Sequence, residues 1–321
     1  MKSAGARDFE VPRPSSTKRL GVYCDDVALD QWLENQEDTV REKFATYVDE
    51  AFFFFDMLVN RPSVKGATTL LEVGGGIGLL SLLLAATGKR VVCVEPESAG
   101  FGGHSKIRQA LLQTWKGQYP DVTYLDGLLE DFPEVGKDFE CAIAIMVVEH
   151  APDYPNLIRS VADHLNSGGE AHFIFPNYAV PYEPHFNIPT VFSKKLTEFF
   201  VASHLRGSWR GIENAQDFWD DLSWPTYRQV KRFFRNSNLN YGFNRDAFIS
   251  YTTRLGSRDF ISRKGPLFQL MIPLAGLMRI AARSLPLAAL PIIDVSVSSP
   301  GDGGRKRLVQ ASPLPVQPEG A

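Results

Sequence analysis

Short apolar runs alternate with amphipathic stretches along the middle of the chain. Five runs rich in apolar and β-branched residues predict strands, at residues 69–73, 90–95, 122–125, 139–145 and 170–175. Between them, apolar residues three and four apart predict helices near residues 79–87, 106–115 and 154–165. Strands that are apolar almost throughout and separated by helices are typical of a parallel sheet covered on both faces. The pattern therefore predicts an open α/β sheet.

The pattern changes on either side of this alternating region. A helical apolar stripe runs through residues 27–59 and includes Phe44, Tyr47, Val48, Ala51, Phe52 and Phe55. Residues 177–223 are rich in aromatic residues and prolines, which indicates an inserted cap rather than another α/β unit. A helix near residues 224–234 and strands near 240–243 and 292–297 are expected to complete the core.

Four glycines fall within five positions where the first strand passes into the first helix of the alternating region. The stretch reads Glu72-Val-Gly74-Gly-Gly76-Ile-Gly78. Glycine permits a positive φ and lets another molecule lie directly on the backbone, and the first amides of the helix then face that molecule. A dinucleotide-binding turn requires G-x-G-x-x-G, but Leu79 or Ser81 occupies the third glycine position in either frame. A tight turn with no ligand is the alternative, which four glycines flanked by acids disfavour.

This stretch resembles motif I of the class I S-adenosylmethionine-dependent methyltransferases, an acidic residue followed by G-x-G-x-G. Glu95 closes the second strand, where a carboxylate can accept hydrogen bonds from ribose hydroxyls. Downstream, FECAIAIMVVEHAPDYPNLIRSVADHLNSGGEAHFIFPN is similar to the same region of the ubiquinone- and menaquinone-biosynthesis type. The resemblance covers roughly residues 66–178. It implies a Rossmann-like, seven-stranded, mostly parallel sheet with helices on both faces and an antiparallel last strand.

The resemblance also implies the cofactor, S-adenosyl-L-methionine, and the residues that bind it. These are Glu72, Gly74, Gly76, Gly78, Glu95 and Leu129. Glu72 has an alternative role in capping nearby backbone amides. Many relatives carry Gly-Asp after the third strand, with the Asp at the adenine amine, whereas this chain has Asp126-Gly-Leu-Leu129-Glu there. Which group of this segment contacts adenine is left open.

Polar residues near the expected acceptor position are the candidates for chemistry. His150 follows the fourth strand and His185 lies in the cap, and either could remove a proton from a hydroxyl acceptor. Substrate contacts are expected from Glu149, Tyr178, Tyr182 and Glu183, with ordinary loop packing as the alternative for each. His104, His164 and His172 are assigned to structure or solvent. No H-x-x-x-H or H-x-H pattern occurs, so no metal site is expected.

With these assignments, the chain divides into six expected segments. They are a flexible N-terminus (1–25), a helical cover (26–65), the S-adenosylmethionine-binding core (66–178), a substrate cap (179–223), the C-terminal part of the core (224–298) and a disordered tail (299–321). The expected reaction moves the methyl group to an oxygen, in preference to nitrogen or carbon, of a small-molecule, glycosyl or lipid-linked acceptor. An NAD-dependent oxidoreductase and a noncatalytic nucleotide-binding or membrane-peripheral protein remain as alternatives.

Composition narrows the partners. The net charge is -3, which gives no indication of a nucleic-acid partner, and the N-terminus lacks the apolar core of a signal peptide, which favours the cytoplasm. Cys93 and Cys141 are expected to be buried on strands that flank a central one. Residues 266–291 are apolar but contain arginines and prolines, so they predict a helix packed on the sheet, with a weak peripheral membrane contact as the alternative. Nothing in the sequence indicates the oligomeric state.

Overall fold

A seven-stranded sheet forms the centre of the protein, as the computed structural model shows for residues 15–96, 104–117, 120–191, 193–206, 215–254 and 275–298. The strand order is β3-β2-β1-β4-β5-β9-β8. The strands are β1 (Thr69–Val73), β2 (Arg90–Val94), β3 (Val122–Leu125), β4 (Phe139–Ile145), β5 (Leu165–Pro176), β8 (Asn240–Asn244) and β9 (Ile292–Ser298). Only β9 runs antiparallel to its neighbours β5 and β8. This confirms the predicted Rossmann-like sheet with an antiparallel last strand.

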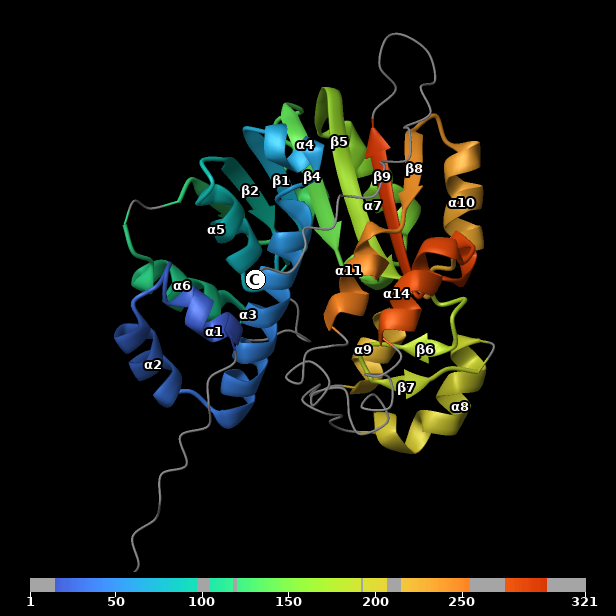
Figure 1. Ribbon diagram of the computed structural model, residues 1–321, viewed down its shortest axis with the longest axis horizontal. Coiled ribbons are helices and arrows are strands. Elements are labelled where there is room, and N and C mark those ends of the chain that lie inside the picture. The colour runs from blue at the N-terminus through green and yellow to red at the C-terminus, as the bar shows by residue number, and fades with distance from the viewer. Residues whose placement is uncertain are drawn as a thin grey trace, which may run out of the picture.

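Helices cover both faces of this sheet (Figure 1). One core cluster joins Leu70, Val91 and Cys141 to α3 and α5, and the other joins Leu71, Val92 and Ala142 to α7 and α10. Alternate residues of each strand therefore enter opposite clusters, as a period of two requires. In the described ranges, the helices outside the cap are α1 (Ser15–Leu20), α2 (Asp26–Glu34), α3 (Asp38–Leu58), α4 (Pro62–Gly66), α5 (Leu79–Ala85), α6 (His104–Thr114), α7 (Tyr154–Asp163), α10 (Tyr227–Asn236), α11 (Asp246–Arg254) and α14 (Ala275–Ser284).

The N-terminal region is more ordered than its sequence predicts. Helix α1 lies within the segment expected to be loose, and Leu20 and Cys24 are both fully buried. Cys24 also forms an isolated bridge with Trp115, which ties this segment to the end of α6. The expectation of a flexible N-terminus is therefore wrong for residues 15–25, because these apolar side chains are buried in the core. Residues 1–14 lie outside the described residues.

The cap lies beyond the carboxyl ends of the parallel strands (Figure 1). It contains the hairpin β6 (Tyr182–Glu183) and β7 (Ile188–Pro189) and the helices α8 (Lys194–Leu205) and α9 (Ala215–Asp221). Its own cluster includes Phe186, Phe218 and the fully buried Trp219. Asn177 fixes the start of the cap, because its side chain donates to the Leu290 carbonyl at 2.8 Å and accepts from the Tyr227 amide at 3.0 Å.

Helix α14 belongs to the segment 266–291, for which a weak peripheral membrane contact was the alternative prediction. Ala282 packs with Phe248 of α11, whereas Leu277 and Ile280 are 64% and 66% exposed. Packing on the protein's own fold thus accounts for one face of α14. No helix within the described ranges is both long and apolar enough to cross a bilayer. Residues 266–274 and the tail 299–321 lie outside those ranges.

Candidate active site

The glycine turn connects β1 to α5 at the carboxyl edge of the sheet. Gly74, Gly76 and Gly78 have φ angles of 76°, 53° and 73°. These left-handed conformations are strained for other residues, so the sequence requires glycine for the path of the turn itself. Gly78 is the N-cap of α5, which directs the first amides of that helix toward the same edge.

The space that a side chain would fill at each of the four glycines is occupied differently. A Cβ atom at Gly74 would collide with Val147, at Gly75 with the Cys93 sulfur, and at Gly78 with Tyr124. At Gly76 it would meet, among the described residues, only the Cε1 atom of His104 at 3.8 Å. Three of the glycines therefore admit the protein's own side chains, whereas Gly76 has an open face toward a ligand as far as the described residues extend. Motif spacing could not separate these two roles.

Glu72 is directed into the protein beside this turn. It is 5% exposed and accepts a short hydrogen bond from the Ser81 hydroxyl on α5. Burial raises the pKa of Glu72 to about 7, against the lowering effect of the Ser81 hydrogen bond. Glu72 thus braces α5 on the turn through the Ser81 side chain, whereas the alternative prediction was the capping of backbone amides. Its contact with the cofactor stays a prediction.

Glu95 follows β2 at the same edge and remains the candidate for ribose. Its backbone amide donates to the Leu125 carbonyl at 3.0 Å, which fixes the residue between β2 and β3. One carboxylate oxygen lies 3.4 Å from Nδ1 of His104. His104, which the sequence assigned to structure or solvent, therefore lies next to both Glu95 and Gly76. Its position at the start of α6 becomes informative only once the strand order is known.

Arg108 is a site residue that the sequence did not indicate. Its guanidinium donates to the Gly76 carbonyl at 2.8 Å and lies over the Tyr124 ring at 4.8 Å from the centroid. Its buried Nε has no partner among the described residues. Arg108 is four residues after His104, so the two share one helix face toward the glycine turn. That spacing was the available signal.

The segment expected at adenine is only partly suited to that role. The side chain of Leu129, in a 3-10 turn at Leu129–Asp131, is 2% exposed and packs in the core. Asp131 accepts from the Leu128 amide at 2.8 Å, and Leu128 itself is 56% exposed. The core holds the Leu129 side chain, so its backbone is the part left to contact the cofactor, and this contact stays a prediction. We therefore assign the proposed adenine contact to the backbone of this turn.

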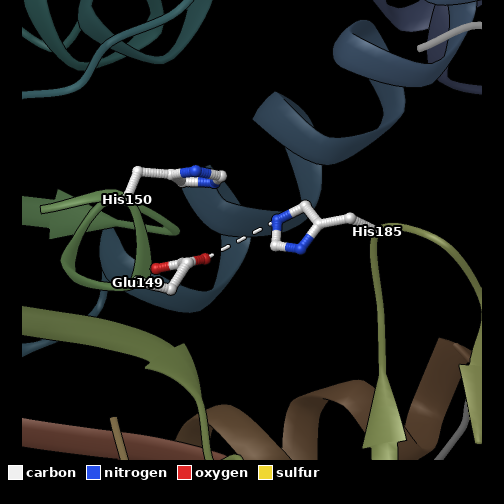
Figure 2. A group of neighbouring side chains, drawn as sticks. All are labelled: Glu149, His150 and His185. Atoms are coloured by element: carbon white, nitrogen blue, oxygen red, sulfur yellow. Dashed lines mark ion pairs between the residues drawn. The ribbon is translucent and has the colours of Figure 1, made fainter. Parts of the chain in front are cut away.

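The acceptor-side candidates meet at one place. Glu149 and His150 lie on a 3-10 turn, Val148–His150, after β4, and His185 lies between β6 and β7. Each residue offers one ligand atom, and these atoms lie within 4.8 Å of one another. Figure 2 shows the three side chains pointing toward one another, with His185 Nε2 3.7 Å from a Glu149 oxygen. Val147, two residues before Glu149, packs against Gly74, so this cluster borders the glycine turn.

Glu149 and His150 are both perturbed by burial. The Glu149 carboxylate is fully buried, and neither of its oxygens has a hydrogen-bond partner among the described residues. Burial raises the pKa of Glu149 to about 7 and lowers the pKa of His150 to about 3. Phe218 edges against the rings of His150 and His185, with centroid distances of 5.1 and 5.3 Å. Apolar surroundings thus favour the uncharged form of Glu149 and of His150.

Glu183 fixes His185. Its Oε1 lies 2.6 Å from Nδ1 of His185 and accepts from the Tyr178 hydroxyl at 3.2 Å, and its Oε2 accepts from the Phe186 amide at 2.5 Å. Burial alone would raise the pKa of Glu183, but His185 and these hydrogen bonds hold it below its usual value. Glu183 is fully buried and bonded to His185, Tyr178 and Phe186, which is the arrangement of a positioning residue. Its contact with a substrate stays a prediction.

The two tyrosines differ in their surroundings. Tyr178 stacks on Trp224 with the centroids 4.8 Å apart, and burial and the nearby carboxylates raise its pKa. Tyr182 donates to Asn187 at 2.7 Å within the β6–β7 hairpin. Both tyrosines stabilise the loop that carries His185. Such loop packing was the alternative to a substrate contact. Their contact with a substrate stays a prediction.

Two other histidines have the structural roles expected of them. His172 is 2% exposed, and its Nε2 and the Ser63 hydroxyl are 2.7 Å apart. It belongs to a buried network in which Arg61 pairs with Asp294 at 2.6 Å. His164 donates from Nδ1 to the Ser160 carbonyl of its own helix at 2.7 Å.

Known proteins with similar sequences match the same region. The profile of a family described as "Methyltransferase domain" matches residues 37–241. An uncharacterized protein of Mycobacterium tuberculosis (strain ATCC 25618 / H37Rv) is 34% identical over 233 residues, which cover 71% of this chain and 78% of the relative. A ubiquinone biosynthesis O-methyltransferase of Methylobacterium nodulans is 31% identical over 165 residues, 50% of this chain and 64% of the relative.

A solved structure of an S-adenosylmethionine dependent methyltransferase from Mesorhizobium loti has a TM-score of 0.47 and 14% identity. The aligned region covers 75% of this chain and 95% of that one. The match to the methyltransferase family removes the oxidoreductase and noncatalytic alternatives. The chain belongs to the methyltransferase-domain family and is a class I S-adenosylmethionine-dependent methyltransferase.

Proposed function

We propose that this protein methylates a hydroxyl oxygen of a small molecule held beneath the cap. One observation carries the proposal: His185, Glu149 and His150 converge next to the turn that carries the open face of Gly76. A neutral hydroxyl is a weak nucleophile until its proton leaves, so an oxygen acceptor needs a group that accepts or displaces that proton. Several curated relatives are named O-methyltransferases, which supports the same choice of acceptor atom.

The transfer itself requires little covalent chemistry from the protein. The bond from the sulfonium sulfur to the methyl carbon breaks, its electron pair stays on sulfur, and S-adenosylhomocysteine leaves. A lone pair of the acceptor oxygen forms the new bond to carbon, and the hydroxyl proton departs at the cluster. Sulfur is a good leaving group, so the protein acts mainly by holding the two reactants in line and excluding water.

The histidines differ as partners for that proton. Because Glu183 accepts from Nδ1 of His185, the lone pair of Nε2 is directed toward Glu149. His150 has a pKa of about 3 because it is buried, so it is a weak base. The arrangement favours His185, in the cap, as the residue next to the reacting oxygen.

The cap also buries two unpaired donors. The indole N–H groups of Trp219 and Trp224 have no acceptor among the described residues. A buried donor without a partner costs roughly 1–3 kcal/mol, so a polar acceptor molecule could recover part of that cost. These donors support a small, partly polar substrate in preference to a purely apolar one.

The test is methyl transfer from S-adenosylmethionine to a panel of hydroxylated aromatic probes, beginning with catechol and alkyl phenols. We expect release of S-adenosylhomocysteine together with one added methyl on oxygen, both measured by mass spectrometry. His185→Ala should reduce kcat at least 100-fold with unchanged affinity for S-adenosylhomocysteine. His164→Ala, a histidine bonded to its own helix, should keep the wild-type rate. Methylation of amine or carbon probes alone would refute the oxygen assignment.

A further inference from the structure

The cluster under the cap has the composition of a metal site. Two imidazoles and one carboxylate offer ligand atoms within 4.8 Å of one another, from a turn after β4 and a hairpin of the cap (Figure 2). Glu149 and His185 are 36 positions apart in sequence, so only the fold brings them together. We propose that Glu149, His150 and His185 bind a borderline divalent cation of the zinc type, with the acceptor hydroxyl at its open coordination position.

The strongest evidence is the unpaired carboxylate of Glu149. It is fully buried, and neither oxygen accepts a hydrogen bond among the described residues. The Nε2 nitrogen of His185 is 3.7 Å from one of these oxygens, which is too long for a hydrogen bond. Buried charges are normally paired or coordinate a metal, because an isolated carboxylate is very costly to desolvate. A cation between Glu149 and His185 would give the buried Glu149 carboxylate a partner.

The spacing already approaches that of ligands around one ion. Zinc lies about 2.0–2.2 Å from nitrogen and carboxylate oxygen in a tetrahedral site, which places neighbouring ligand atoms about 3.4 Å apart. The His185 nitrogen and the Glu149 oxygen are 3.7 Å apart. All three ligand atoms lie within 4.8 Å of one another, so binding would draw them closer together.

The surroundings of His185 match those of a metal-binding histidine. Such a residue commonly donates its second ring nitrogen to a carboxylate, which fixes the ring and leaves the other nitrogen free to coordinate. Glu183 accepts from Nδ1 of His185 in this way at 2.6 Å. Glu183 is itself held by Tyr178 and the Phe186 amide. The outer shell of a metal site is therefore already built.

The ligand types select the class of metal. Imidazole nitrogens suit zinc and related first-row ions, whereas magnesium and calcium prefer oxygen ligands. Three protein ligands leave one tetrahedral position open, as in catalytic zinc sites. A hydroxyl bound there would lose its proton to solvent at neutral pH without a side-chain base. This use of the metal rests on the proposed O-methylation, whereas binding of the metal does not.

Metal binding is tested first, without any acceptor. The untagged full-length protein is stripped with EDTA, dialysed against zinc chloride and analysed for bound zinc, and titrated with cobalt(II) while its visible spectrum is recorded. We expect one zinc per chain and an intense tetrahedral cobalt band. Glu149→Gln and His185→Ala should each weaken binding roughly 100-fold or more, and Glu183→Gln roughly 10- to 100-fold. His164→Ala should bind like the wild type.

The outcomes separate the two proposals. No zinc and no cobalt band with the wild-type protein would overturn the metal site, a result that needs no variant to fold. So would binding that survives both ligand substitutions in variants with native circular dichroism. Full transfer by the EDTA-stripped enzyme would overturn coordination of the acceptor and leave O-methylation standing. Zinc binding without O-methylation of any probe would instead count against the proposed function alone.

Discussion

At the scale of single residues, the open face of Gly76 is the feature on which cofactor binding depends. We predict that Gly76→Val abolishes binding of S-adenosylhomocysteine, because the new side chain fills the space above the turn. Gly88→Val is the control, since Gly88 has a similar positive φ of 88° and an added Cβ there would meet no described residue within 4 Å. It carries the same backbone strain away from the site. Calorimetry that finds equal affinity in both variants would contradict this role for Gly76.

The two acids that flank the turn should behave differently. Glu95→Gln removes the charge from the expected ribose contact and should weaken S-adenosylhomocysteine binding by about 2 kcal/mol, roughly 30-fold. Glu72→Gln should change it by less than about threefold, because Glu72 is bonded to Ser81 inside the protein. Isothermal titration of both variants decides. A larger loss in Glu72→Gln than in Glu95→Gln would reverse the assignment.

Most of the site residues that could be predicted from the sequence lie close together along the chain. The acid-x-G-x-G-x-G spacing and Glu95 indicated the cofactor, because a strand, a turn and a helix that are contiguous fix their own relative positions. The cluster of Glu149 with His185 could be proposed only as separate candidates. A search for H-x-x-x-H looks along one helix, whereas these ligands come from a turn and a hairpin joined by the cap.

At the scale of elements, helix α10 follows the cap in the chain and packs into the core, and side-chain hydrogen bonds fix its first turn. Thr226 is the N-cap, and it forms a reciprocal capping box with Gln229. Thr226→Ala should lower the free energy of unfolding by about 1 kcal/mol, because an amide of the first turn loses its acceptor. Thr253→Ala, at an exposed position near the end of α11, should cost less than about 0.5 kcal/mol. Urea unfolding measures both, and equal losses would show that the cap is not responsible.

Element boundaries show where local pattern stops being informative. The strands β1 and β4 match their predicted ranges because continuous apolar runs mark buried parallel strands. The edge strand β3 also matches its range, although its residues are only partly buried. Strand β5 begins at Leu165, five residues before the predicted start. Its pairing with β4 is irregular between Leu165 and Glu170. Its Gly168 has a φ of 91°, so a pair of glycines that usually ends a helix is used inside a strand. Pairing of β5 with β4 therefore determines the conformation here, although the local sequence pattern is that of a helix end.

At the scale of the whole molecule, the buried acids make stability depend on pH. The pKa of Glu72 rises from 4.5 to about 7 on folding because the carboxyl is desolvated. Between those values the folded state keeps a proton that the unfolded state has lost, so the free energy of unfolding falls as pH rises. Above about pH 7 both states are ionised and this dependence ends. The same sign applies to Glu149, whose pKa burial also raises to about 7.

Glu72→Gln isolates one of these contributions, because glutamine is neutral in both states. Relative to the wild type, the variant should gain roughly 3 kcal/mol of stability between pH 4 and pH 8.

Glu140 is the control of opposite sign, since hydrogen bonds from Thr68 lower its pKa and its contribution is lost as pH falls. Glu140→Gln should therefore lose stability relative to the wild type as pH rises. Urea unfolding of all three proteins at each pH unit gives the comparison. If the curve for Glu72→Gln runs parallel to that of the wild type, this carboxyl does not keep a proton in the folded protein, and the bracing of α5 is instead by an ionised Glu72.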